Sequence, residues 1–556
     1  MGTRSADTAV GHHVRVAVGP RRAWSTTGGT RATGYAFQGE KLLRAEQLAT
    51  AVEAMQPDAL PALLDGLNGS FAAIKEAPDA VYAIVDQIRG IPLFCVDKGG
   101  GRVITDDPLE IPGVHERACN WKVRAELLEC LCVTGADTLL DGVRQVEAGS
   151  LLRVPAASQG TMESRPWYAF QPNLDPDTSG NLVETAYEAH RAAVERTIRF
   201  AGDALIVVPL SAGRDSGILA TLLAASGIDR DQVLTYTFGR RGNRESEVSR
   251  RVAESLGLRW ELVPYSDSMW YELARQPWWP AYLTWASSLA GVPGFADVPA
   301  MGELRRRGLV PDGSVVMPGH SLDFPAGSHI PGRLVRRSRG SPTDVIDAVL
   351  TAYYKYRSDD VIASLLGRST AEVAEAMRER VERSVPATPA SMTREQLVSV
   401  TDEWGWKERQ AKLIVNSVRV YEHQGLRWAL PWWDREVLDF WARVPLRQRV
   451  GHPLRDELAE RAGWPATAPS ALDGLQSRLE RQVRMLALDG AAKKLRNLAR
   501  RATKRSRYQH DELACFALFG EKRFVRSFHG TETPRAMLAE DLLKSLDTAG
   551  EPPLER

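Results

Sequence analysis

The stretch VVPLSAGRDSGILATLL, residues 207–223, is the most informative part of the chain. It joins a continuously apolar run, 204–210, to a helical pattern over 216–226, so a buried parallel strand is expected to turn directly into a helix. Between them lie Ser211, Ala212, Gly213, Arg214, Asp215 and Ser216. Small residues let backbone N–H groups approach phosphate oxygens, and the helix start adds N–H donors and a favourable dipole. The pattern predicts a pyrophosphate-binding loop.

The acidic residue of this loop has a different expected role. Asp215 is not expected to bind phosphate directly, because two anions repel each other, so we expect it to hold Mg²⁺ that bridges to the phosphates. The hydroxyls of Ser211 and Ser216 are expected to donate hydrogen bonds to phosphate. The plainer interpretation is an ordinary strand-to-helix turn capped by serine and aspartate. The loop is not a Walker A loop, because it lacks G-x-x-x-x-G-K-[ST].

The residues around the loop predict a doubly wound sheet. Buried strands are expected at 233–239, 260–265 and 314–319, and helices at 182–200 and 245–257. Strands and helices that alternate at this spacing imply right-handed crossovers between parallel strands. Residues 340–460 are expected to be mainly helical.

The first 170 residues have a different pattern. Turn formers separate short apolar runs, which predict strands at 14–18, 70–74, 81–86 and 102–105, with helices at 45–55 and 122–132. The stretch QPNLDPDTSG, 171–180, is rich in loop-forming residues. We therefore expect one domain over 1–170, a linker over 171–180 and a second domain over 181–556.

The composition argues against several classes of function. The net charge is +1, with 71 basic and 70 acidic residues, so neither a nucleic-acid partner nor a membrane surface is indicated. A basic stretch over 475–507 is interpreted as a solvated helix face, with an anionic substrate or carrier partner as the alternative. The five cysteines form no CxxC pair, and no apolar run reaches about 18 residues. A reducing, cytoplasmic location is expected.

The phosphate loop resembles the SGGxDS loop of the PP-loop ATP pyrophosphatases. Ala212 stands where that family has glycine, and its methyl group narrows the approach to phosphate, although alanine is small enough that binding is expected to survive. The resemblance implies that Leu210, Ser211, Ala212, Gly213, Asp215 and Ser216 contact ATP.

Four further segments are similar to the asparagine-synthetase family. TFG (237–239) places Phe238 where an aliphatic residue of the family contacts the nucleotide. PGHSLDFPAGSHI (318–330) resembles the family's SGxGxDExxxGY segment, so Pro318 and Gly319 are expected to meet the nucleotide and Asp323 to hold Mg²⁺. Phe324 replaces the family's glutamate. The other two segments are 422–445 and 452–460.

This resemblance implies the fold class and the cofactors. The second domain is expected to be an adenine-nucleotide α-hydrolase-like (PP-loop) α/β domain, with a parallel sheet and a helical substrate region. The first is expected to be an Ntn-type αββα glutaminase-like domain of the α+β class. The implied cofactors are ATP and Mg²⁺.

Catalytic roles are also implied by the resemblance. His320 occupies the place of a tyrosine that helps to deprotonate the attacking amine in β-lactam synthetases, so a general base is expected there, with a structural histidine as the alternative. Glu403, Glu408 and Glu422 are possible orienting partners. The family's charge-stabilising lysine is missing near Gly451. Other cations could supply the positive charge of this lysine, and for each of them the alternative is an ordinary surface charge. The candidates are Arg447, Arg449, Arg455 and Lys412.

The first domain resembles the glutaminase half of the same family at 67–74, 85–96 and 133–154. There, a cysteine exposed by removal of the initiator methionine is the nucleophile. Here that place is Gly2, and the first cysteine, Cys95, lies in a strand-like run where a buried thiol is expected. We therefore expect no release of ammonia from glutamine.

The expected function is ATP-dependent formation of an amide bond, in which a carboxylate is activated as acyl-AMP and transferred to an amine. Partners are the carboxylate and amine substrates, with a homodimer or a separate nitrogen-donor protein as possibilities. The identity of the substrates stays open, since relatives include β-lactam synthetases and lasso-peptide cyclases. The alternatives are an inactive nucleotide- or partner-binding protein, an ammonia-dependent asparagine synthetase and an RNA-modifying enzyme. Tryptophans near 278–285 and 428–433 are expected to line a substrate pocket or to be core.

Overall fold

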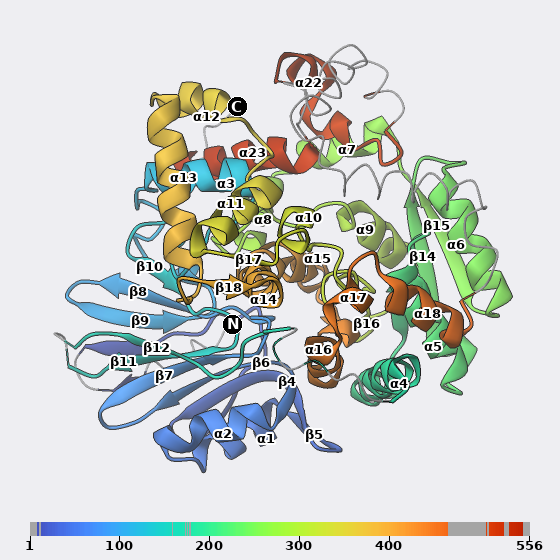
Figure 1. Ribbon diagram of the computed structural model, residues 1–556, viewed down its shortest axis with the longest axis horizontal. Helices are drawn as coiled ribbons and strands as arrows, with labels where there is room; N and C mark the ends of the chain where they lie inside the picture. The colour runs from blue at the N-terminus through green and yellow to red at the C-terminus, as the bar shows by residue number, and fades with distance from the viewer. Residues whose placement is uncertain are drawn as a thin grey trace.

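Two β-sheets packed face to face form the first third of the chain in the computed structural model (Figure 1). The structure describes residues 8–10, 13–157, 160–172, 174, 176, 180–464, 508, 511–527 and 533–548. The first sheet has the order β1 (Thr8–Val10), β2 (Val14–Val16), β9 (Gly101–Thr105), β8 (Phe94–Lys98), β10 (Val143–Gln145). The second has the order β12 (Glu163–Pro166), β11 (Ser150–Pro155), β7 (Ala80–Val85), β6 (Leu67–Glu76), β4 (Thr30–Gln38), β3 (Ser25–Thr27), with β5 (Lys41–Arg44) paired to β4.

The period of two along each strand divides the core of this half into two layers. On β6, Ala72 and Ile74 face the other sheet, whereas Phe71 and Ala73 face α1 (Ala45–Glu53) and α2 (Leu60–Asp65). These helices form one outer layer. Helix α3 (Trp121–Cys130) does not form the second helical layer of the expected αββα arrangement. It packs mainly on three helices of the other half: α12 (Asp359–Leu366), α13 (Thr370–Ser384) and α23 (Pro534–Thr548). The expected four layers are therefore seen only in part.

A five-stranded parallel sheet organises the second half, as predicted. Its order is β15 (Arg259–Pro264), β14 (Val233–Gly239), β13 (Ile206–Pro209), β16 (Val315–Val316), β19 (Arg427–Trp428), and every neighbouring pair is parallel. The chain moves outward from β13 to β15 and then returns to the other side of β13. This reversal places the carboxyl ends of β13 and β16 at the point where ligands bind in such sheets. The predicted strand over 314–319 is shorter in the structure, because it pairs only at Val315 and Val316.

Helices cover both faces of the parallel sheet. In Figure 1, α5 (Arg214–Ala225) and α6 (Arg244–Ser255) lie on one side of β14 and β15, and α9 (Val298–Arg306) lies on the other. Helix α4 (Leu182–Ala201) starts where the Asn181 side chain accepts from the Glu184 N–H, and it ends before Gly202, whose φ is 62°. Its buried residues recur every three or four positions, and the helix packs on α16 (Arg435–Arg443) and α18 (Pro453–Ala462).

Shorter helices complete the chain. Between the sheet strands lie α7 (Asp267–Ala274), α8 (Trp279–Ala286), α10 (Gly332–Val335), α11 (Pro342–Tyr353), α12 (Asp359–Leu366), α13 (Thr370–Ser384), α14 (Arg394–Trp404) and α15 (Arg419–His423). After β19 follow α16 (Arg435–Arg443), α17 (Leu446–Arg449), α18 (Pro453–Ala462), α22 (Glu521–Ser527) and α23 (Pro534–Thr548). A short hairpin of β17 (Arg339–Gly340) and β18 (Met392–Thr393) interrupts the region that was predicted, and is confirmed, to be mainly helical.

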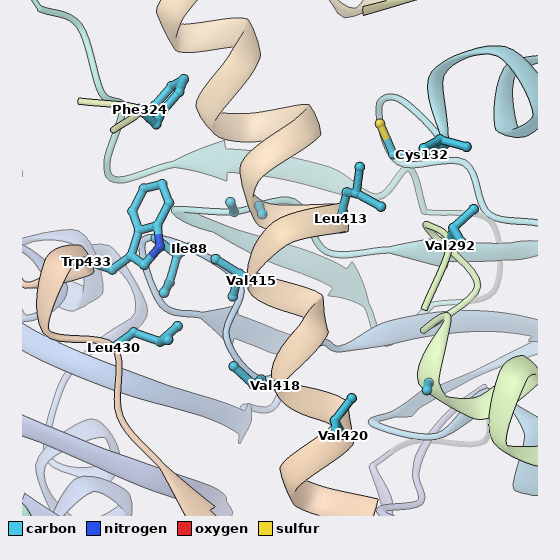
Figure 2. Packing of buried hydrophobic residues seen from close by; sticks show 14 of the residues in the cluster. Ile88, Cys132, Val292, Phe324, Leu413, Val415, Val418, Val420, Leu430 and Trp433 are labelled. Atoms are coloured by element: carbon cyan, nitrogen blue, oxygen red, sulfur yellow. The ribbon is translucent and has the colours of Figure 1, made fainter. Parts of the chain in front are cut away.

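A continuous helical stretch after α14 joins the two halves of the molecule. It passes through a π-helix, Gly405–Ile414, and a 3₁₀ turn, Val415–Val418, before α15. Figure 2 shows Val415 of this stretch close to Ile88 of the first half and Trp433 of the second. Hydrogen bonds from Trp406 Nε1 to the Gln87 carbonyl and from Gln87 Nε2 to the Trp433 carbonyl, both 3.0 Å, reinforce this contact.

Some expectations fall on other parts of the chain. Gly2 and the basic stretch over 475–507 lie outside the described residues, as does part of 171–180. All five cysteines are unpaired by disulfides, as expected. Within the described ranges, no helix has the length and apolar character needed to cross a bilayer.

Candidate nucleotide site

A cavity of about 640 Å³ opens at the carboxyl ends of β13 and β14. Three segments supply most of its wall: the end of β13 with its loop, the end of β14, and the loop after β16. Its lining residues are Pro209, Leu210, Ser211, Gly213, Arg214, Asp215, Ser216, Tyr236, Thr237, Phe238, Glu245, Asp297, Pro318, Gly319, His320, Ser321, Asp323, Tyr421 and Arg455. The structure thus brings together residues that are more than 200 positions apart in the sequence.

Hydrogen bonds to the hydroxyl groups of Ser211 and Ser216 fix the conformation of the loop after β13. The Ser211 N–H donates to Ser216 Oγ at 3.1 Å, the two Oγ atoms are 3.0 Å apart, and the Gly213 N–H donates to Ser211 Oγ at 3.1 Å. Helix α5 begins directly afterwards with Gly213 as its N-cap. The N–H groups of its first turn have no acceptor within the helix, so they suit an anion.

The loop after β16 lies directly against this helix start. A Cβ atom on Gly319 would come within 2.5 Å of Ser216 Cα and 2.9 Å of the Ser216 nitrogen. Only glycine permits that approach. Four residues later, the Asp323 N–H donates to Asp215 Oδ2 at 2.9 Å, so the two predicted metal ligands are neighbours.

The charges at this point are arranged around two carboxylates. Burial, together with the nearby Asp323 charge, raises the pKa of Asp215 to about 7. Burial alone would raise the pKa of Asp323 as well, but the hydrogen bond and charge of His329, with Arg455, hold it below its usual range. Arg455 Nη1 lies 3.7 Å from Asp215 Oδ1, and His329 Nε2 lies 3.5 Å from Asp323 Oδ2. Two carboxylates on one wall suit a divalent cation, which would relieve the repulsion that raises the pKa of Asp215.

The other end of the cavity is aromatic. Phe238 stacks on Tyr265, with ring centroids 5.2 Å apart and an interplanar angle of 20°. The Tyr265 hydroxyl donates to the Ala296 carbonyl at 2.6 Å, which ties the start of α9 to this wall. The Tyr421 hydroxyl donates to Asp297 Oδ2 at 2.9 Å. This end has the flat apolar surface that a nucleobase needs, with polar groups behind it.

Residues 187–461, which supply the whole of this cavity, match the sequence profile of the asparagine synthase family. They form an asparagine synthase domain. The family consists of ATP-dependent amidotransferases and ligases, so the cavity belongs to a domain whose family uses ATP to form amides.

Comparison with other proteins adds little to this assignment. No curated protein matches the chain. Among solved structures, the NH3-dependent NAD synthetase of Campylobacter jejuni is 15% identical and covers 37% of this chain and 99% of its own, with a TM-score of 0.20. The glutamine-dependent NAD+ synthetase of Acinetobacter baumannii, solved with adenosine diphosphate, is 13% identical and covers 52% of this chain and 64% of its own, with a TM-score of 0.19.

His320 lines the cavity of the asparagine synthase domain. Its Nδ1 is 3.1 Å from Ser321 Oγ and its Nε2 is 3.4 Å from Ser417 Oγ. Burial lowers the pKa of His320 to about 4, so the imidazole is neutral near pH 7 and is able to accept a proton. The three glutamates considered as its partners are engaged elsewhere: Glu403 with Gln171, Glu408 with Lys412 and Glu422 with Arg22.

Two of the expected catalytic cations lie outside the cavity of the domain. Lys412 is fully buried at the contact between the halves, where Nζ donates to the carbonyls of Val133 and Gly135 and pairs with Glu408. Arg449 is also fully buried, and it donates to the Pro325 carbonyl at 2.7 Å and to Asp402 at 2.8 Å. Both side chains bind partners outside the cavity, so the structure does not bring them together with the other expected site residues. Arg455 alone of the three reaches the cavity.

The structure adds residues that the sequence argument missed. His329 is the partner of Asp323, and its place only six residues later in the segment 318–330 was a usable signal. Asp297, Tyr236 and Tyr421 come from separate elements, and no local pattern marks them. Phe324, which replaces the family's glutamate, is buried against Phe170, His329 and Trp433. The tryptophans considered for a substrate pocket do not line the cavity, although Trp432 Nε1 donates to the Asp215 carbonyl at 3.3 Å.

Proposed function

We propose that the chain is an ATP-dependent carbon–nitrogen ligase that activates a carboxylate as its acyl-adenylate and transfers the acyl group to an amine. The observation that carries this proposal is the meeting of the phosphate loop, Asp215, Asp323 and Arg455 in one cavity of an asparagine synthase domain. Asp215 and Asp323 would hold Mg²⁺, which would neutralise charge on the phosphates.

The residues of the loop have a defined part in this reaction. The N–H groups at the start of α5 bind and orient the β- and γ-phosphates, so that the α-phosphorus faces the incoming carboxylate. Arg455 supplies positive charge beside Asp215, in the role of the family's missing lysine. Phe238 offers a stacking surface to the adenine, and Leu210, Pro318 and Gly319 complete the nucleotide contacts.

His320 is proposed to accept the proton of the attacking amine. The imidazole is neutral because burial disfavours its charged form, and it lines the same cavity as the phosphate loop and Phe238. Ser321 and Ser417 orient its two nitrogens. Because the imidazole is neutral, it places no positive charge beside the amine before the reaction.

The first half is proposed to be a glutaminase-like domain of the Ntn type without glutaminase activity. Gly2 stands where the nucleophilic cysteine is expected. Cys95 does not replace it, because burial raises the pKa of its thiol to about 12, and a buried protonated thiol is unreactive. Nitrogen would then come from an amine substrate, free ammonia or a separate nitrogen-donor protein.

The test is to identify the nucleotide products formed from Mg-ATP with pooled small carboxylates and amines, using the wild-type protein and Asp215→Ala. AMP and pyrophosphate from the wild type alone would support the proposal, and fractionation of the pool would then find the substrates. ADP and phosphate would contradict it. Formation of asparagine from aspartate and ammonia would instead support the alternative function, an ammonia-dependent asparagine synthetase. In a parallel assay, release of glutamate from glutamine would contradict the loss of glutaminase activity.

A further inference from the structure

Arg214 is a second arginine on the wall of the nucleotide cavity, and the reaction proposed above does not use it. It is the first residue of α5, directly after the N-cap Gly213. Its side chain is 44% exposed, whereas the side chain of Arg455, on the same wall, is 12% exposed. Arg455 is thus the more enclosed of the two cations, and Arg214 lies nearer to solvent.

Both arginines pair loosely with aspartates across the contact between α5 and α18. Arg214 Nε lies 3.3 Å from Asp456 Oδ1, and Arg455 Nη1 lies 3.7 Å from Asp215 Oδ1. Each helix start contributes one arginine and the aspartate next to it, so the charges alternate across the contact. A close charge-assisted hydrogen bond of this kind measures about 2.7–2.9 Å. Neither guanidinium group therefore gives up a strong bond when it turns to a better acceptor.

The position of Arg214 favours an anion at the start of α5. A helix start carries partial positive charge, and the N–H groups of its first turn have no acceptor within the helix. A guanidinium group in the same turn adds a further cation, which is unfavourable unless an anion lies against both. Asp456 meets this need only in part, because it comes from α18 and the pair joins it to Nε at 3.3 Å. A phosphate group on the loop would meet it fully.

We propose that Arg214 binds the terminal phosphates of ATP and holds the pyrophosphate that leaves when the carboxylate is activated. The inference rests on the proposed function, since it assigns the triphosphate to the loop 211–216. In that step a carboxylate oxygen bonds to the α-phosphorus, and the bond from the α-phosphorus to the oxygen that bridges it to the β-phosphorus breaks. The bridging oxygen keeps the electron pair, so the leaving pyrophosphate gains a negative charge. A planar guanidinium group, with paired N–H donors, suits the oxygens of such an anion.

The test measures the binding of pyrophosphate and of AMP, each with Mg²⁺ and without ATP, by calorimetry. Arg214→Gln is expected to weaken the binding of pyrophosphate at least about tenfold and to change that of AMP by less than about twofold, because AMP lacks the terminal phosphates. Arg214→Lys should keep part of the affinity, since lysine retains the charge but not the planar donors.

Arg394→Gln is the matched control. Arg394 is also the first residue of a helix, its side chain is 45% exposed, and it lies 3.4 Å from Glu395, but it does not line the cavity. This variant should bind pyrophosphate as the wild type does. Equal binding of pyrophosphate by the wild type and Arg214→Gln would overturn the inference, as would an equal loss of AMP binding in Arg214→Gln or no binding of pyrophosphate by the wild type.

A purely structural role of Arg214 is tested by Asp456→Asn, which breaks the same ion pair and keeps the arginine. This variant is expected to bind pyrophosphate at least as tightly as the wild type, because Asp456 competes with the phosphate for the guanidinium group. Equal weakening in Arg214→Gln and Asp456→Asn would show that the pair only ties α5 to α18, and would overturn the inference.

Kinetics with ATP give a second readout. Arg214→Gln should raise the KM for ATP about tenfold and change kcat by less than about threefold, because the terminal phosphates are bound equally before and during the reaction. An unchanged KM would contradict the inference. A wild type that forms no AMP would contradict the proposed function, whereas the role of Arg214 as an anion ligand would be decided by pyrophosphate binding, which needs no turnover.

Discussion

Single residues decide the chemistry at the end of β13. Asp215 lies in the first turn of α5 and Asp323 lies in the loop after β16, 108 positions later, yet the Asp323 N–H donates to the Asp215 carboxylate. Burial of these groups in one wall, with Arg455 beside them, gives the alternating charges that a metal–phosphate complex requires. The replacement of the family's loop glycine by Ala212 leaves this geometry in place.

Arg455 is predicted to act on the phosphates. Arg455→Gln should slow pyrophosphate formation about 10²- to 10³-fold, because it removes a preorganised donor at the site of developing charge. Initial rates of pyrophosphate release would measure this effect. Arg461→Gln is the control, since Arg461 lies on the same helix but pairs with Glu184 at the surface. Equal losses in both variants would indicate damage to α18 rather than a role in the reaction.

His320 is predicted to act after adenylation. His320→Gln should lower the rate of amide formation by about 10²-fold or more, while the first burst of pyrophosphate remains. The pKa of about 4 means that the imidazole stays neutral as the pH falls through 6.5, where an ordinary histidine becomes charged. The imidazole of the wild type should therefore stay unprotonated down to about pH 5, and the rate of amide formation should not fall through loss of this base above that pH. Rapid-quench measurements of both products would check this, and equal loss of both steps would contradict a role as base.

Much of this site was predictable at the level of residues, and the exceptions have a physical cause. The loop after β13 was expected from its own pattern at a strand end, where ligands bind in parallel sheets. Phe238, Pro318, Gly319 and Asp323 were expected from the resemblance to the asparagine-synthetase family, and they line the same cavity. Lys412 and Arg449 are near the site along the chain, but the directions of their side chains depend on tertiary packing. Asp297 and Tyr421 join the site only through long-range contacts, which no local motif records.

At the scale of elements, the π-helix Gly405–Ile414 is the least predictable feature. It carries a row of buried charges, including Glu408, Arg409 and Lys412, through the contact between the two halves. A helical pattern was expected over this region, but the wider turn was not, because the same apolar spacing suits an ordinary helix. By contrast, β14 and α4 begin where the sequence predicted and end within one residue, since turn formers and caps fix their ends.

The pair of Lys412 and Glu408 is predicted to stabilise the fold. Lys412→Met should lower the free energy of unfolding by about 3–5 kcal/mol, because it leaves Glu408 buried without its cation. The double change Lys412→Met with Glu408→Leu should recover part of that loss. Urea unfolding followed by tryptophan fluorescence would measure both. Unchanged stability together with a loss of pyrophosphate formation would restore the catalytic role that the structure argues against.

At the scale of the whole molecule, the two halves share one core. Arg22 of the first half pairs with Asp106 of the same half and with Glu422 of the second half. Glu422 also pairs with Arg419 of the second half. Apolar side chains from both halves continue across the contact, as Ile88, Val415 and Trp433 show (Figure 2). The first half therefore supports the synthase domain through ion pairs and apolar packing that the two halves share.

We predict that both halves unfold together. Scanning calorimetry of the wild type should show a single transition, and Glu422→Gln should lower its midpoint without splitting it, because the lost charge served cations from both halves. Two transitions, of which only one moves in the variant, would contradict a shared core.

Binding of Mg-ATP tests the central claim, that the loop 211–216 and the loop 318–323 together form the triphosphate site. Calorimetry should find one site per chain in the wild type. Affinity should fall at least about tenfold in Asp215→Asn and in Asp323→Asn, and only in the presence of Mg²⁺, because each carboxylate acts through the metal. Tight binding that both substitutions leave unchanged would place the nucleotide elsewhere and contradict the account.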